Sequence, residues 1–341
     1  MEFGVAVLGD HPSARIVELA RLCEELGLDT VWVNDERFYR DVFVNMTLVA
    51  CHTRRVKVGC MVTDPFVRHP ALTAAAAASV DELSGGRAVL GLGAGMSGFR
   101  EMGIERVRPA RAIKEAVQLI HRLTRGEREI GFEGELVRFR GGHLGFTPLR
   151  PVPVYVAGRG PRVLEAGGEV ADGVVIGSFA SERGIIWGLE HAARGARRAG
   201  RRLDALETVS WLYTSISPDG RQARELVRKG VAVAMWGSRD VLDDIGVALP
   251  PAVVRFMDAH PYRYEPARLA EVAGLLPDEL LEAFSVAGTA EEVAAKLVRI
   301  GRLGIRQAAL WLFPPGGDDL ETVLRPLAAD VIPRVRAALA R

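Results

Sequence analysis

The chain has few of the features that mark a secreted or membrane protein. Its three cysteines, Cys23, Cys51 and Cys60, form no CxxC pair, and an odd number cannot all pair with one another. This scarcity favours a reducing compartment, so we expect a cytoplasmic protein. The N-terminal stretch lacks the basic segment and apolar run of a signal peptide, and no apolar run is long enough to span a bilayer.

An excess of charge of one sign is also missing, because 44 Lys and Arg residues nearly balance 43 Asp and Glu residues. The formal net charge of +1 gives no field that would recruit nucleic acid or an anionic membrane. The basic stretch "RGARRAGRR" (194–202) has no interleaved aromatic residues and is most simply the solvated end of a helix. The seven histidines show neither HxH nor HExxH spacing, so we expect no metal site.

What the chain does have is 48% apolar residues, arranged as strand-like segments that alternate with helix-like ones. Helical patterns such as "SARIVELARLCEELG" (13–27) separate the strands, and no linker or composition break interrupts the series. Eight covered parallel strands in one chain of this length predict an α/β fold, a TIM barrel formed by a single domain over 1–341. The expected strands span 2–8, 30–33, 56–62, 88–93, 152–158, 172–178, 208–216 and 307–313.

One segment is too long for a simple loop of such a barrel. Residues 235–285 are predicted to form a mostly helical insert before strand eight, which covers the barrel mouth or builds a subunit contact. Directly after the insert, "TAEE" (289–292) has the pattern of a capping box, in which Thr289 caps the next helix and Glu292 bonds back to it.

Glycines follow the fourth predicted strand, in the sequence "GAGMSG" (93–98). This sequence matches the GxGxxG of a dinucleotide-binding fold, but no acid ends a following strand at the required distance, and Glu115 lies inside a helical pattern. We therefore favour the alternative that Gly93 and Gly95, at the carboxyl end of a barrel strand, leave room for a flat ligand.

A second glycine-containing loop, in "AGRGPRVLEAGG" (157–168), connects the fifth strand to a helix. Its free N–H groups and the helix dipole suit a phosphate, and its arginines add positive charge. The alternative is a tight turn with two solvated arginines. The residues concerned are Gly158, Arg159, Gly160, Pro161 and Arg162. Residues Gly177 and Ser178, in "GSFAS" (177–181), could contribute to the same phosphate site.

Three polar residues in a row, Asn34, Asp35 and Glu36, end the second strand in "VNDERFYRD" (33–41). Polar side chains at the carboxyl end of a barrel strand face the place where TIM barrels do their chemistry. Asn34, Asp35 and Glu36 are therefore candidate site residues, and Asp35 and Glu36 are the candidates for a catalytic role. The alternative is a helix-capping Asp with surface neighbours.

The third strand, in "VKVGCMV" (56–62), is interrupted by Gly59, which indicates a bulge or a close approach to the backbone. The next residue, Cys60, has no local base that would make it a nucleophile. We therefore interpret Cys60 as a small buried residue.

Taken together, these stretches resemble one family. "VTDPFVRHPALTAAAAASVDELSGGRAVLGLGAG" (62–95) is similar, nearly residue by residue, to the third and fourth units of methylenetetrahydromethanopterin reductase. That family uses coenzyme F420 and belongs to the bacterial-luciferase-like superfamily. "YVAGRGPRVLEAGGEVADGVVIG" (155–177) and "LLEAFSVAGTAEEVAAKLVRIGRLGI" (280–305) also look like their counterparts, and the resemblance covers nearly the whole chain.

The resemblance implies a TIM barrel that binds the deazaflavin coenzyme F420 at the carboxyl ends of its strands. It implies a non-prolyl cis peptide bond in the third strand, at Gly59–Cys60, where the backbone would support the flat ring. It places the phosphate end of the cofactor at Gly158–Arg162. It places Asp35 and its neighbour Asn34 near the deazaflavin, with Thr63 close by. The expected partners are a small-molecule substrate and, because homodimers are usual in the family, a second copy of the chain.

The chain departs from the family pattern at two positions. As aligned with the methanogen reductases, Ala6 replaces a Glu of the first strand and Met96 replaces an Asp after the fourth. Alanine and methionine can neither relay a proton nor balance a developing positive charge. The comparison therefore predicts F420 binding but inefficient reduction of methylenetetrahydromethanopterin, and it favours a less polar substrate.

Three functions are compatible with these features. The first is an oxidoreductase that transfers a hydride between F420 and a small organic substrate, with the protein supplying position and electrostatics. The second keeps the barrel but uses flavin mononucleotide (FMN), as luciferase-like monooxygenases do, with the same loop binding the phosphate. The third is an F420-binding protein with little catalysis, which the residues Ala6 and Met96 motivate. The resemblance favours the first.

Overall fold

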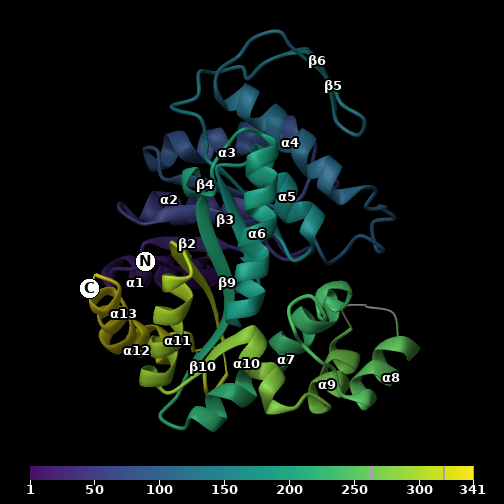
Figure 1. The fold of residues 1–341 in the computed structure, drawn as a ribbon. Coiled ribbons are helices and arrows are strands. Elements are labelled where there is room, and N and C mark those ends of the chain that lie inside the picture. Colours follow the sequence, from purple (N-terminus) through teal and green to yellow (C-terminus); the bar gives the residue numbers. More distant parts are fainter. Residues whose placement is uncertain (261–264, 318, 341) are drawn as a thin grey trace. The chain divides into compact units, whose positions relative to one another are not determined.

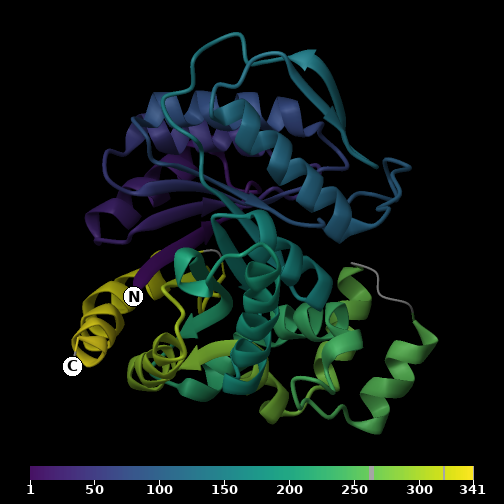
Figure 2. The ribbon, with the colours of Figure 1, turned by 45° about the horizontal axis from the view of Figure 1, so that its top comes forward.

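The computed structural model describes residues 1–260, 265–317 and 319–340 of the chain. The chain divides into two compact units. Unit 1 comprises Met1–Phe3, Ile176–Glu190 and Thr208–Arg341, and unit 2 comprises Gly4–Val175 and His191–Glu207. Their elements are drawn in Figures 1 and 2. The assignment of 1–341 to a single domain stays a prediction.

The strand order confirms the predicted α/β barrel. The sheet runs β10-β9-β11-β1-β2-β3-β4-β7-β8, and a further pairing of β8 with β9 closes it. Neighbouring strands from β1 to β7 pair in parallel, as do β9 and β11. The barrel strands are β1 (Glu2–Val7), β2 (Thr30–Val33), β3 (Lys57–Thr63), β4 (Ala88–Leu92), β7 (Val154–Gly158), β8 (Gly173–Gly177), β9 (Glu207–Ile216) and β11 (Gln307–Leu312).

Helices separate the strands along the chain, as the alternating pattern predicts. They are α1 (Ser13–Glu25), α2 (Val42–His52), α3 (Pro70–Ser84), α4 (Pro109–Thr124), α5 (Pro161–Val170), α6 (Glu182–Arg198), α7 (Gly220–Gly237), α11 (Ala290–Arg302), α12 (Glu321–Pro326) and α13 (Ile332–Leu339). The predicted capping box of α11 is confirmed, because Thr289 N donates to Glu292 Oε2 (2.7 Å) and Glu292 N donates to Thr289 Oγ1 (3.3 Å). No helix in the described part of the chain combines the length and hydropathy needed to cross a bilayer.

The structure adds three short strands and one helix break to the predicted elements. Strands β5 (Ile130–Glu133) and β6 (Arg138–Gly142) pair antiparallel, and β10 (Ser285–Gly288) pairs with the last residues of β9. Segments this short give almost no periodic signal. The helical segment after β11 is divided by a π-helical turn over Leu327–Val331, because Pro333 has no N–H to donate to the carbonyl four residues earlier.

The predicted insert before β11 is helical, as expected. It contains η2 (Arg239–Val241), α8 (Pro251–Ala259), α9 (Pro266–Gly274) and α10 (Asp278–Phe284), and residues 261–264 lie outside the described residues. Helices α9 and α10 pack against α7, and both views show this group of helices together (Figures 1 and 2). Its role at the barrel mouth or in a subunit contact stays a prediction.

A buried carboxylate in α4 fixes the β5–β6 hairpin of unit 2. Glu115 accepts the N–H groups of Glu135 (3.0 Å), Leu136 (2.9 Å) and Val137 (3.0 Å). Arg111 Nε lies 2.8 Å from the same carboxylate. The hairpin extends beyond α4 in Figure 1. Glu115 therefore has a local structural role, which agrees with rejecting it as the acid of a dinucleotide-binding fold.

Trp32 fills the interior of the barrel in unit 2. The register pairs Ala6 with Trp32 and Trp32 with Gly59, and directly paired residues point to the same face of a sheet. Trp32 is fully buried, and its ring centroid lies 6.1 Å from that of Tyr155 on β7. Strands β3 and β4 lie between β2 and β7 in the sheet order, so the two rings meet inside the curve of the sheet.

The irregularity of β3 is real, but it lies two residues later than predicted. Gly59 is in regular register with Trp32 and Val89, and a Cβ added to it would overlap Cε3 of Trp32. The register of β3 on β4 shifts between Cys60 and Thr63, and the non-prolyl cis bond is Met61–Val62. The predicted cis bond at Gly59–Cys60 is wrong, because Gly59 makes room for the Trp32 ring rather than marking the cis bond.

We predict that Gly59→Ala destabilises the protein by about 3 kcal/mol, because the new methyl overlaps a ring that has no space to move. The measurement is the free energy of unfolding from urea denaturation. Gly131→Ala is the matched control, since a Cβ there meets nothing within 4 Å. Shrinking the ring with Trp32→Leu should make the double variant less destabilised than the sum of the two single changes. Strict additivity, or an unchanged Gly59→Ala variant, would contradict this account of Gly59.

Candidate functional site

One arginine in unit 2, which no sequence motif singles out, brings the loops after β2 and β3 together. Arg37 Nη1 lies 2.8 Å from Asp35 Oδ1 and donates to the Asp35 main-chain oxygen (3.1 Å). Arg37 Nη2 forms an ion pair with Asp64, which is fully buried. The other Asp64 oxygen, Oδ1, accepts the N–H groups of Phe66 (2.8 Å) and Val67 (2.9 Å). The guanidinium therefore holds two carboxylates from two different loops.

The loop after β4 packs on the same arginine. The Arg37 guanidinium carbon lies 5.7 Å from the ring centroid of Phe99, and the Arg106 guanidinium carbon lies 5.1 Å from the same centroid. Gly98 has a left-handed φ of 75°, and a Cβ there would overlap the Arg37 side chain. Arg37 therefore contacts the loops that follow three neighbouring strands.

Glu36, a predicted catalytic residue, accepts a hydrogen bond from another of these loops. The Ser97 hydroxyl donates to Glu36 Oε2 at 2.5 Å. Burial raises the pKa of the Glu36 carboxyl, and the opposing effects of the Ser97 hydrogen bond and the Arg37 charge do not cancel this. Asp35 and Glu36 are thus adjacent carboxyl groups in different surroundings. Asp35 pairs with the Arg37 cation, and Glu36 accepts a hydrogen bond from the Ser97 hydroxyl. Such a pair can divide the roles of fixed anion and proton carrier.

Asn34 and Asp41 flank these carboxyl groups. Asn34 is buried, its N–H donates to Val7 O (3.2 Å), and its Oδ1 has no hydrogen-bond partner among the described residues. Asp41 caps α2 by accepting the N–H groups of Phe43 (2.9 Å) and Val44 (3.1 Å). Helix capping in this segment is therefore done by Asp41, which leaves Asp35 and Glu36 for other contacts.

Two predicted residues of β3, Cys60 and Thr63, have different surroundings. Cys60 follows the inward-facing Gly59, so its side chain points to the opposite face of the sheet. It is fully buried, and burial raises the pKa of its thiol well above the ordinary value. The interpretation of Cys60 as a small buried residue is confirmed. Thr63 is buried beyond the register shift, and its main-chain oxygen accepts the N–H of Gly93 (2.9 Å).

The glycines after β4 make room for the protein itself. A Cβ on Gly91 would overlap the Cys60 carbonyl oxygen, and one on Gly93 would lie 2.7 Å from Val62 Cγ2. Gly95 has a left-handed φ of 67°, and a Cβ there would lie 2.6 Å from the Phe99 ring. These positions are therefore glycine because of the displaced β3 backbone and the Phe99 ring. Contact of Gly93 and Gly95 with a flat ligand stays a prediction.

The loop after β7 has the predicted form. Gly160 is the N-cap residue of α5, Pro161 is in the first turn, and no side chain caps the helix. A Cβ on Gly160 would meet nothing within 4 Å. Arg159 is half-buried, and its Nη1 contacts Met96 Sδ (3.4 Å), with no carboxylate partner among the described residues. The loop thus combines open helix N–H groups with a cation free to meet an anion.

Four further predicted residues differ in their surroundings. Gly158 packs against Val163, because a Cβ on it would lie 2.7 Å from Val163 Cγ1, and Arg162 is exposed. Gly177 and Ser178 belong to unit 1. Ser178 is fully buried with a left-handed φ of 61°, and its Oγ has no partner in the described part of the chain. Their contact with a phosphate stays a prediction.

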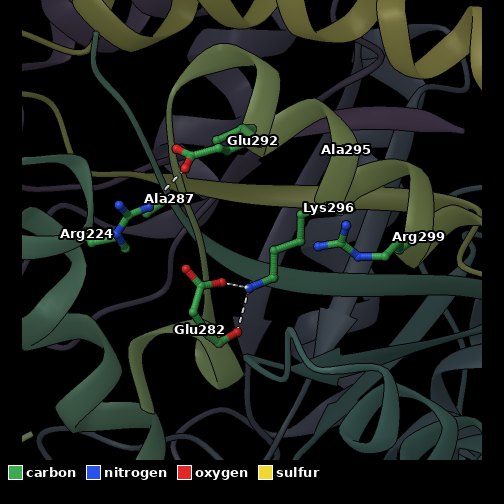
Figure 3. Close-up of a pocket in the computed structure, with 8 residues that line it drawn as sticks. Arg224, Glu282, Ala287, Glu292, Ala295, Lys296 and Arg299 are labelled. Atoms are coloured by element: carbon green, nitrogen blue, oxygen red, sulfur yellow. Dashed lines mark hydrogen bonds and ion pairs between the residues drawn. The ribbon is translucent and has the colours of Figure 1, made fainter. Parts of the chain in front are cut away.

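A cavity of about 290 Å³ in unit 1 contains none of the predicted residues (Figure 3). Its buried lysine, Lys296, donates to the main-chain oxygens of Glu282 (2.5 Å) and Ser285 (2.7 Å) and to Glu282 Oε2 (3.0 Å). Burial lowers the pKa of Lys296, but its three protons are all used. Lys296 therefore ties α10 to β10 and is not free to act on a ligand. Within the described residues no group of three or more His, Cys, Asp or Glu residues could hold a metal ion.

Comparison with known proteins places this geometry in a family. The model of the luciferase-like monooxygenase family matches residues 1–307. The 5,10-methylenetetrahydromethanopterin reductase of Archaeoglobus fulgidus is 32% identical over 338 residues, which cover 98% of this chain and all of that protein. The F420-dependent glucose-6-phosphate dehydrogenase of Nakamurella multipartita is 30% identical over 340 residues, which cover 95% of this chain and 93% of that protein.

Solved structures agree with these relatives. The F420-dependent tetrahydromethanopterin reductase of Methanopyrus kandleri superposes with a TM-score of 0.84 at 26% identity, covering 98% of this chain and 99% of that one. An F420-dependent secondary alcohol dehydrogenase in complex with an F420–acetone adduct gives a TM-score of 0.80 at 21% identity, covering 98% of this chain and all of that one, and shows the fold alone. With a family match over residues 1–307 and near full-length relatives at 30% identity or more, the chain belongs to the luciferase-like monooxygenase family and is an oxidoreductase.

Proposed function

We propose that the protein transfers a hydride between coenzyme F420 and a small organic substrate. The observation that supports this most is the near full-length similarity to two kinds of enzyme. One is F420-dependent by name, and the other has a structural counterpart that is F420-dependent. The Archaeoglobus reductase (32% identical) has a structural counterpart from Methanopyrus described as F420-dependent, and the Nakamurella dehydrogenase (30% identical) is F420-dependent by name. Structures of flavin-dependent members of the fold are 16–18% identical, so they carry no weight for the choice of cofactor.

The residues of unit 2 fit such a cofactor. The uncapped N-terminus of α5, the open space at Gly160 and the Arg159 guanidinium would hold its phosphate. Asn34 Oδ1 is a buried acceptor without a partner in the described residues, so it would take a hydrogen bond from a ligand at the end of β2. When bound, F420 supplies or accepts a hydride at carbon five of its central ring.

The protein's own contribution would be orientation and proton handling. Asp35, held by Arg37, offers a fixed carboxylate that can orient hydrogen-bond donors of the substrate. Glu36 is the candidate that takes up or releases a proton, because burial raises the pKa of its carboxyl above the ordinary value. The Ser97 hydroxyl holds the Glu36 carboxyl in place without neutralising it by charge.

The substrate is proposed to differ from that of the methanogen reductases. Ala6 lies on the inner face of β1, paired with Trp32, and offers no acid there. Met96 offers only a thioether, which contacts Arg159. Neither side chain can take part in proton transfer or balance positive charge on a pterin. A less polar substrate is compatible with both.

We also propose a homodimer. Helices α2 and α3 of unit 2 pack together and expose large apolar side chains: Val44 on α2 is 58% exposed, and Leu72 and Leu83 on α3 are 60% and 51% exposed. Leu72 and Leu83 are eleven residues apart, so they share a face of the helix. An apolar helix face of this kind is costly in water and favours self-association.

The cofactor proposal predicts that the protein binds F420 more tightly than FMN when each is titrated and followed by fluorescence. Arg159→Met should weaken F420 binding about tenfold, the loss of roughly one charge-assisted hydrogen bond. Arg202→Met is the matched control, because Arg202 pairs with Asp204 at an exposed site. Tighter binding of FMN than of F420 would instead favour a flavin-dependent enzyme.

A second prediction concerns the substrate. With reduced F420, turnover of methylenetetrahydromethanopterin should be slower by at least about 100-fold than in the methanogen reductases, because the two acids are absent. The double variant Ala6→Glu/Met96→Asp should raise that turnover. A rate typical of the methanogen enzymes in the unmodified protein would overturn the proposed difference in substrate.

The dimer proposal predicts a mass of twice 36.9 kDa in sedimentation velocity. Leu72→Glu should shift the population to monomers, since it places a charge in the apolar face. Leu275→Glu is the control, because Leu275 is also an exposed apolar residue (39%) but lies after α9. A monomeric unmodified protein at micromolar concentration would exclude the homodimer.

A further inference from the structure

The charges after β2 and β3 are distributed unevenly around Arg37. Its guanidinium contacts both Asp35 and Asp64, while Glu36, the residue between Asp35 and Arg37, bonds to the Ser97 hydroxyl. Asp64 is fully buried, and Arg37 is its ion-pair partner among the described residues. Both Arg37 amino groups are therefore committed to carboxylates other than that of Glu36.

The position of Arg37 is also tightly fixed. The Phe99 ring lies against the guanidinium at 5.7 Å from its centroid, and Gly98 leaves no space for a side chain beside Arg37. Asp64 is held in turn by the N–H groups of Phe66 and Val67. A cation that is fixed from three loops exerts a constant field on the carboxyl beside it, and this field is weakly screened where water is excluded.

We propose that Arg37 is a positioning residue of the active site, which anchors the loops after β2, β3 and β4 and sets the charge environment of the Glu36–Ser97 pair. This inference rests on the proposed function, in which Glu36 handles the proton of the reaction. Arg37 itself is not proposed to touch the substrate.

The groups that act on Glu36 fix the sign of the expected effect. Burial and the neighbouring Asp35 charge raise the pKa of Glu36, while Ser97 and Arg37 lower it. Tyr39 is a further titratable group that interacts with Glu36. Burial raises the pKa of Tyr39 most, and the negative charges of Asp10 and Glu36 raise it further. Removing the Arg37 charge therefore removes one of the two effects that lower the pKa of Glu36, so Glu36 should titrate at higher pH.

The test removes the positive charge of Arg37 without leaving a charged Asp64 unpaired in the interior. Arg37→Met alone strands a buried carboxylate and can unfold the protein, so the comparison is between Asp64→Asn and Arg37→Met/Asp64→Asn. The Asp64→Asn change removes the charge but keeps a side-chain oxygen for the N–H groups of Phe66 and Val67. The readout is the titration of Glu36, followed by carboxyl-carbon NMR on isotope-labelled glutamate, with Glu36→Gln identifying the resonance.

We expect the midpoint of the Glu36 titration to rise by about one pH unit when Arg37→Met is added to Asp64→Asn. Arg37→Lys keeps the positive charge but loses the planar fork. The midpoint of the Glu36 titration should therefore move by less than half as much with Arg37→Lys as with Arg37→Met. A midpoint that stays constant or falls in the Arg37→Met/Asp64→Asn variant would overturn the inference, because a purely structural arginine would change loop order without this shift.

The same variants separate this inference from the proposed function. The NMR titration needs neither cofactor nor substrate, so it tests the influence of Arg37 even if F420 does not bind. If F420 and a substrate are turned over, the pH profile of kcat/KM should contain a limb that Glu36→Gln removes and that moves up by the same pH shift. A profile whose limbs do not respond to Arg37→Met/Asp64→Asn would count against Arg37 while leaving hydride transfer intact.

Discussion

The register shift in β3 is the constraint on which the candidate site depends. From Cys60 to Thr63 the strand advances three residues, while its neighbour β4 advances two, from Leu90 to Leu92. The displaced backbone places Val62 beside Gly93, and it brings Asp64 to the turn where the N–H groups of Phe66 and Val67 bind its carboxylate. Since a slip of one residue exchanges the faces of a strand, regular pairing would turn Asp64 away from Arg37.

Once Asp64 is buried, it dictates the charge arrangement around it. A buried carboxylate without a partner costs about 3–5 kcal/mol, so the loop after β2 has to supply a cation that reaches it. Arginine suits this position better than lysine, because its planar fork can hold Asp64 and Asp35 with different nitrogen atoms. The consequence for chemistry is that Glu36 receives no direct ion pair and its proton affinity is governed by burial. The cation that Asp64 requires therefore lies one residue from Glu36 and lowers the pKa of its carboxyl, against the larger effect of burial.

The barrel is predictable from sequence because its signals are local and repeated, whereas the site depends on contacts that no local pattern encodes. The apolar run of β1 and the caps of α3 and α11 identify their elements from a few adjacent residues. Gly59 does mark a close approach, as predicted, but the approaching group is Trp32, 27 residues earlier, and only the β2–β3 register identifies it. Arg37 is inconspicuous beside two acids in the sequence, because its partner Asp64 is also 27 residues away.

The polar groups that remain without partners indicate where unit 2 still has capacity for a ligand. An unsatisfied buried polar atom costs about 1–3 kcal/mol, so a folded chain keeps few of them unless something else completes the bond. Asn34 Oδ1 is of this kind within the described residues, and it follows the carboxyl end of β2. Lys296 shows the contrast, because its cavity is open but its three hydrogen bonds are complete. Unmet hydrogen-bonding capacity, more than empty volume, therefore distinguishes a candidate binding site in this protein from a structural cavity.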